Sequence, residues 1–123
     1  MTVSLRDNNL YMKAFRYALN IIEVYKSLSK SNENVLSKQL LRFGTSVGAN
    51  ITEANGVISK ADFSSKISIG YKECLESKYW LDLLNDSDYI SESKHVHLFE
   101  QTDELAKIMF AILRTMRIHK TGK

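Results

Sequence analysis

The chain has 123 residues with no proline, one cysteine and a formal net charge of +3, a length that suits a single domain over residues 1–123. One cysteine allows no intrachain disulfide, and the sequence shows neither a signal-peptide pattern nor an apolar run long enough to span a bilayer. These features favour a cytoplasmic protein that makes no membrane contact.

Apolar residues recur at helical spacing in four segments, at about residues 8–29, 34–54, 59–86 and 91–120. Asp7 or Asn8 can cap the first helix, and Ser59 followed by Asp62 resembles a capping box before the third. Gly56 is expected to end the second helix in a left-handed conformation. Helices of this length joined by short loops predict an all-α, antiparallel up-down-up-down four-helix bundle.

The second helix contains an unusual run of small and polar residues over positions 44–53. Each glycine inside a helix costs roughly 1 kcal/mol relative to alanine, so close helix packing is expected to offset the cost. If the turn after this helix centres near residue 57, facing residues have numbers that sum to about 114. Gly44 should then face Gly70 at a close crossing, with Gly48 one turn away.

Asn50 and Glu53 form a second feature of this segment. Glu53 lies in the last turn of the second helix, where a negative charge opposes the helix dipole. A local partner is therefore expected, namely the free N–H groups at the start of the third helix, near residues 60–63. We interpret the pair as a polar clasp that fixes the turn, and a binding site at this end of the bundle is the alternative.

The fourth helix is apolar on every side between Leu105 and Leu113, where eight of nine residues are apolar. A monomeric bundle buries only one stripe of each helix, so we expect self-association to cover the remainder. The predicted oligomer interface consists of Leu105, Ile108, Met109, Ile112 and Leu113.

Basic residues concentrate near the end of the chain, since residues 105–123 carry five basic and no acidic side chains. Several cations on one surface raise the affinity for phosphate groups steeply. The candidate nucleic-acid contacts are Lys13, Arg16, Arg114, Arg117, Lys120 and Lys123. A solvated charged surface is the alternative interpretation.

No pattern in the sequence indicates catalysis. Glu92 and His95 form one half of a di-iron motif, but the mid-helix carboxylates that would complete it are missing. Cys74 occupies an apolar helical position without the base and electropositive setting that a nucleophile needs. We therefore expect no catalytic residue, no metal site and no cofactor.

Several motifs in the centre of the chain resemble one family. They are residues 46–56 (SVGANITEANG), Asp62-Phe63, Ile69-Gly70, Lys72-Glu73 and Tyr79-Trp80-Leu81. Together they resemble the four helix bundle protein family, first noticed as proteins encoded in intervening sequences of ribosomal RNA genes. One departure is residues 52–56 (TEANG), where the family often shows Ala-Glu-Gly.

The resemblance implies a four-helix subunit assembled into a ring, typically a pentamer, without catalytic residues. The ribosomal label of the family reflects gene location. In a related protein, the accessory variability protein of diversity-generating retroelements, a basic ring surface engages reverse transcriptase and nucleic acid. The expected function is thus that of a homo-oligomeric, non-enzymatic interaction or scaffold protein. The alternative is an accessory protein that binds RNA, DNA or a nucleic-acid enzyme through a basic surface.

Overall fold

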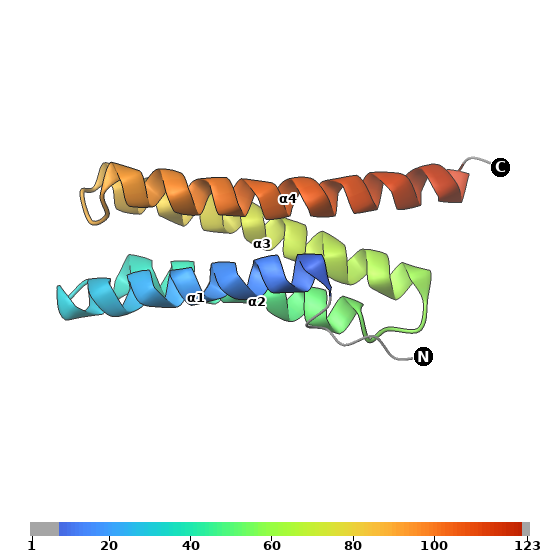
Figure 1. Cartoon of the computed structure of the whole chain (residues 1–123), viewed down its shortest axis with the longest axis horizontal. Coiled ribbons are helices and arrows are strands. Elements are labelled where there is room, and N and C mark those ends of the chain that lie inside the picture. Colours follow the sequence, from blue (N-terminus) through green and yellow to red (C-terminus); the bar gives the residue numbers. More distant parts are fainter. Residues whose placement is uncertain (1–7, 122–123) are drawn as a thin grey trace.

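The computed structural model describes residues 8–121, with side chains through residue 117. Four α-helices make up the fold: α1 (Asn9–Lys30), α2 (Val35–Ala54), α3 (Lys60–Asp86) and α4 (Glu92–Thr121). The chain runs back and forth, so that α1 and α3 point one way and α2 and α4 the other (Figure 1). This arrangement confirms the predicted all-α up-down-up-down bundle, and the helix bounds lie close to the predicted ones.

Side-chain caps explain where the helices begin. Asn8 Oδ1 accepts a hydrogen bond from Tyr11 N at 2.9 Å, and Ser59 Oγ accepts one from Asp62 N at 3.1 Å. The start of α2 is capped by a carboxylate that sequence reasoning missed. The buried Glu33 side chain accepts from three backbone N–H groups, those of residues 35, 36 and 37, at 2.8–3.2 Å. A carboxylate there satisfies free N–H groups and suits the positive end of the helix dipole.

The end of α2 differs from the prediction. No glycine of the described chain has a positive φ, so Gly56 does not take the left-handed conformation. Gly56 N instead donates to Glu53 O at 3.0 Å, which tightens the last turn. Left-handed residues follow the other two helices that end within the described chain: Asn32 after α1 (φ 64°) and Asp88 after α3 (φ 66°).

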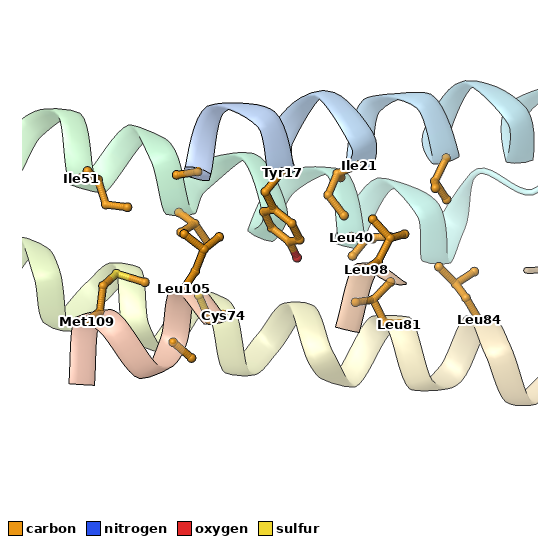
Figure 2. Packing of buried hydrophobic residues seen from close by; sticks show 14 of the residues in the cluster. Tyr17, Ile21, Leu40, Ile51, Cys74, Leu81, Leu84, Leu98, Leu105 and Met109 are labelled. Carbon is orange, nitrogen blue, oxygen red and sulfur yellow. The ribbon is translucent and has the colours of Figure 1, made fainter. Parts of the chain in front are cut away.

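One stripe from each helix forms the core between the helices. Figure 2 labels ten of its members: Tyr17, Ile21, Leu40, Ile51, Cys74, Leu81, Leu84, Leu98, Leu105 and Met109. At the centre, the Thr102 hydroxyl is hydrogen-bonded at 2.7 Å to the hydroxyl of Tyr17 and at 2.7 Å to the Leu98 carbonyl. Burial raises the pKa of Tyr17 above its ordinary value, so this phenol stays protonated. The polar pair fixes how α1 and α4 meet.

Candidate interaction surfaces

The three predicted packing glycines face neighbouring helices rather than one another. A Cβ atom on Gly44 would lie 3.0 Å from Ile21 Cγ1, and one on Gly48 would lie 3.6 Å from Ala14 Cβ. Both glycines therefore pack against α1. A Cβ atom on Gly70 would lie 3.1 Å from the sulfur of Met109 on α4. The predicted Gly44–Gly70 crossing is wrong, although the glycines do allow close approach.

The register of α2 and α3 explains this correction. Gly70 lies beside Val47 and Asn50 of α2. The residue numbers of facing positions therefore add up to more than the sum of about 114 that a symmetric turn near residue 57 predicts. The connection between the two helices covers residues 55–59, and its last residue, Ser59, is extended (φ −116°, ψ 152°). The path of this connection sets the height of α3 along α2, and sequence periodicity cannot reveal that path.

The predicted polar clasp is also wrong in its partners. Asn50 Nδ2 donates to the Ser46 carbonyl of its own helix at 2.9 Å. Glu53 Oε1 forms a salt bridge with Lys66 Nζ on α3 at 2.8 Å, rather than binding the free N–H groups at the start of that helix. Because both side chains are substantially exposed, such a pair contributes only ~0–1 kcal/mol.

The predicted interface on α4 divides into two environments. Leu105 and Met109 are 1% and 0% exposed and belong to the core of the subunit, so they cannot contact another subunit. Ile108, Ile112 and Leu113 are half-buried. The neighbouring Phe110 was not among the predicted interface residues, yet it is 51% exposed. The centre of its ring lies 5.8 Å from that of Tyr71 on α3. The all-round apolar pattern thus overestimated the free surface on this helix.

The structure describes the side chains of four of the six basic candidates. Lys13 Nζ is paired with Glu104 at 2.8 Å, while Arg16, Arg114 and Arg117 are exposed. Arg114 lies ten residues beyond Glu104 on α4, which corresponds to ~15 Å along the helix. The side chain of Lys120, and all of Lys123, lie outside the described part of the chain.

The remaining candidates for chemistry lie in structural settings. His95 Nε2 is 2.8 Å from Asp82 Oδ1 on α3, and Glu92 is exposed. Within the described residues, no group of three or more His, Cys, Asp or Glu side chains could hold a metal ion. Cys74 is buried, and its burial raises the pKa of the thiol from 9.0 to about 12. No described helix is long and apolar enough to cross a membrane.

The outer side of the α3–α4 pair carries apolar side chains that the subunit leaves uncovered. Leu75 and Tyr79 on α3 are 46% and 56% exposed, and Phe110 continues this surface onto α4. The opposite side of the bundle, formed by α1 and α2, exposes Leu19 to 50%. The exposure of these residues could not be predicted from the sequence, because they alternate with core residues of the same helices.

Comparison with known proteins gives a consistent match. Residues 6–111 match the family described as 23S rRNA-intervening sequence protein. A crystal structure of a protein of unknown function from the S23 ribosomal protein family of Bacteroides thetaiotaomicron VPI-5482 superposes with a TM-score of 0.83 at 39% sequence identity. The match covers 85% of this chain and 97% of that chain. No curated protein matches this chain.

Proposed function

Since this chain belongs to the 23S rRNA-intervening sequence protein family, we propose that it is a non-enzymatic subunit that assembles with copies of itself into a scaffold for other molecules. The observation that carries the proposal is the set of uncovered apolar side chains on the outer side of α3 and α4. Large apolar patches on monomeric proteins are uncommon and usually mark an interaction site. Fivefold symmetry comes from the family resemblance alone.

A scaffold role agrees with the distribution of polar groups. Polar contacts such as Thr102–Tyr17 inside the bundle, and Lys78–Asp103 (2.8 Å) between α3 and α4, tie helices to each other. The single cysteine is compatible with the reducing cytoplasm, where we place the protein. The function of the assembly then depends on which surfaces its subunits expose to other molecules.

Static light scattering of the purified protein at micromolar concentration tests the proposal. We expect a mass that is a multiple of 14.1 kDa, five subunits if the family resemblance holds in full. A dimer or tetramer keeps self-assembly and removes the fivefold ring. A mass of one subunit over the whole concentration range contradicts the proposal.

Nucleic-acid binding through the basic surface has weaker support, because Lys13 is neutralised by Glu104 and Arg114 lies well beyond that pair. Arg16 on α1 and Arg114 and Arg117 on α4 are exposed, and this exposure is what favours the alternative among the described side chains. Titration of labelled RNA and DNA across a salt series separates the two functions. An affinity that decreases with salt concentration, with a slope that corresponds to several neutralised phosphates, supports the alternative. Absence of binding at low salt removes it.

A further inference from the structure

We propose that the outer side of α1 in one copy of this chain packs on the outer side of α3 in the next copy, with both copies pointing the same way. This inference rests on the proposed self-assembly and names the two surfaces that produce it. The α1 stripe consists of Leu19, Ile22, Lys26 and Lys30. The α3 stripe consists of Leu75, Tyr79, Asp82 and Asp86.

Helical spacing places each set on one side of its helix. The α1 stripe recurs at i, i+3, i+7 and i+11, and the α3 stripe at i, i+4, i+7 and i+11. Residues at such intervals lie above one another along a helix. Seven of the eight side chains are exposed, and Ile22 is half-buried. Each stripe is therefore an outer surface distinct from the core stripe of the same helix.

The two stripes are complementary in composition and in order. Following the chain, the α1 stripe presents two apolar residues and then Lys26 and Lys30. The α3 stripe presents two apolar residues and then Asp82 and Asp86. Aligned in parallel, the apolar halves meet and each lysine meets an aspartate. Opposite charges at matching positions fix the register and the choice of partner.

The fold supplies the parallel alignment. Helices α1 and α3 run in the same direction in the bundle (Figure 1). The packing of Ala14 on Gly48 and of Asn50 beside Gly70 sets their relative heights, and counting along the helices places Leu19 within one turn of Leu75. Neighbouring copies can thus stand side by side at nearly the same height.

The α1 and α3 stripes also lie on different sides of the molecule. Each helix packs mainly on its neighbours in the chain, so the outer side of α1–α2 faces away from the outer side of α3–α4. Two different surfaces that bind each other produce a ring when the rotation closes, or a filament when it does not. The pairing therefore predicts an assembly that can exceed two copies.

Pairing of two α3 stripes is the competing arrangement, and charge argues against it. In a parallel self-pair, Asp82 and Asp86 would face the same aspartates of the partner. In an antiparallel self-pair, they would lie on Leu75 and Tyr79 without a cation. Carboxylates buried without a partner are strongly unfavourable. Asp82 Oδ1 already contacts His95, and 57% of its side chain remains exposed for a second cation.

Charge reversal tests the pairing directly. The pair Lys26→Glu with Lys30→Glu, and separately the pair Asp82→Lys with Asp86→Lys, should each raise the dissociation constant of the assembly at least about tenfold. The fourfold variant restores opposite charges across the interface and should recover most of the association. Lys94→Glu, a reversal on an exposed residue of α4 outside both stripes, is the matched control and should leave association unchanged.

The apolar half has its own variants. Leu19→Asp and Leu75→Asp should each reduce the mass in light scattering toward 14.1 kDa, with circular dichroism confirming that the helices remain folded. Val35→Asp, at an exposed apolar residue outside the stripes, should keep the wild-type mass. An oligomeric wild type that none of the stripe variants affects overturns the pairing and leaves self-assembly standing. A fourfold variant that stays dissociated overturns the pairing as well. A monomeric wild type overturns the pairing and the proposed function together.

Discussion

The core residues of α3, which form its inner stripe, and the outer α3 stripe occupy adjacent positions in the sequence. The two sets nevertheless have opposite environments. Cys74 and Leu81 are fully buried, whereas Leu75 and Tyr79 are about half exposed. Leu75 and Tyr79 are apolar like the core residues beside them, so hydrophobicity alone does not distinguish these four positions. Position relative to the other three helices does, because only the inner stripe is enclosed by the subunit. The inner stripe stabilises the subunit, and the outer stripe is available to a neighbour.

Truncation of one residue in each stripe should give the largest contrast. Leu81→Ala removes fully buried volume and should lower the free energy of unfolding by about 2–5 kcal/mol. Leu75→Ala, compared under conditions where the subunit is monomeric, should cost well under that amount because solvent already reaches the side chain. Urea unfolding of both variants measures the difference. Equal losses would show that the outer side is part of the subunit core.

Thiol labelling compares the same two stripes at neighbouring positions. Because burial raises the pKa of Cys74 to about 12, its reaction with a thiol reagent in the native protein should be slower than that of a free thiol by orders of magnitude. A cysteine introduced by Leu75→Cys in a Cys74→Ala background should react readily in the monomer. Fast labelling of native Cys74 would contradict the buried setting.

The same thiol predicts a pH dependence. The pKa of Cys74 is higher in the folded chain than in the unfolded chain, so the folded state binds more protons between these two values. The free energy of unfolding should therefore fall as the pH rises from 9.0 toward 12. Cys74→Ala should reduce this slope in urea unfolding at a series of alkaline pH values, and an unchanged slope would assign it to other groups.

The buried hydroxyl pair should give an intermediate effect. Thr102→Val removes one hydrogen-bond partner of the buried Tyr17 hydroxyl and leaves its other partner, Ser77, in place, which should cost about 0.5–1.5 kcal/mol in unfolding. Thr115→Val, at an exposed position later in α4, is the matched control and should change stability little. Similar effects at both positions would mean that water reaches the Tyr17 hydroxyl.

The smallest effect is expected at the exposed salt bridge between α2 and α3. Glu53→Gln should lower the free energy of unfolding by ~0–1 kcal/mol, and high salt should remove the difference. Lys66→Met in the same background completes a double-mutant cycle. A coupling several times larger would restore the idea that Glu53 fixes the turn.

The sequence was a good guide to the helices and a poor guide to their register. Residues such as Asn8 and Ser59 signal helix starts through local hydrogen bonds, which depend only on neighbouring residues. The heights at which Gly44 and Gly70 lie depend on the path of residues 55–59, which is set by packing between distant segments. For the same reason Leu105 and Met109 resembled interface residues in the sequence and are core residues in the fold.

The outer stripes were missed for a different physical reason. Leu75 and Tyr79 lie beside core residues in the sequence of α3 but on another side of the helix. A helix with apolar residues on two sides gives no clear amphipathic pattern. Their meaning depends on how much of each side chain the bundle leaves exposed. Only with the helices placed does the match between the α1 stripe and the α3 stripe become visible.

Disulfide cross-linking tests the pairing of these stripes most directly. The variant Lys30→Cys with Asp86→Cys in a Cys74→Ala background places one thiol at the end of each stripe and keeps the apolar halves intact. Mild oxidation should give a ladder of covalent species in multiples of 14.1 kDa, while either single-cysteine variant should give almost none. Dimers formed by a single-cysteine variant, or no ladder from the double variant of an oligomeric protein, would contradict the account.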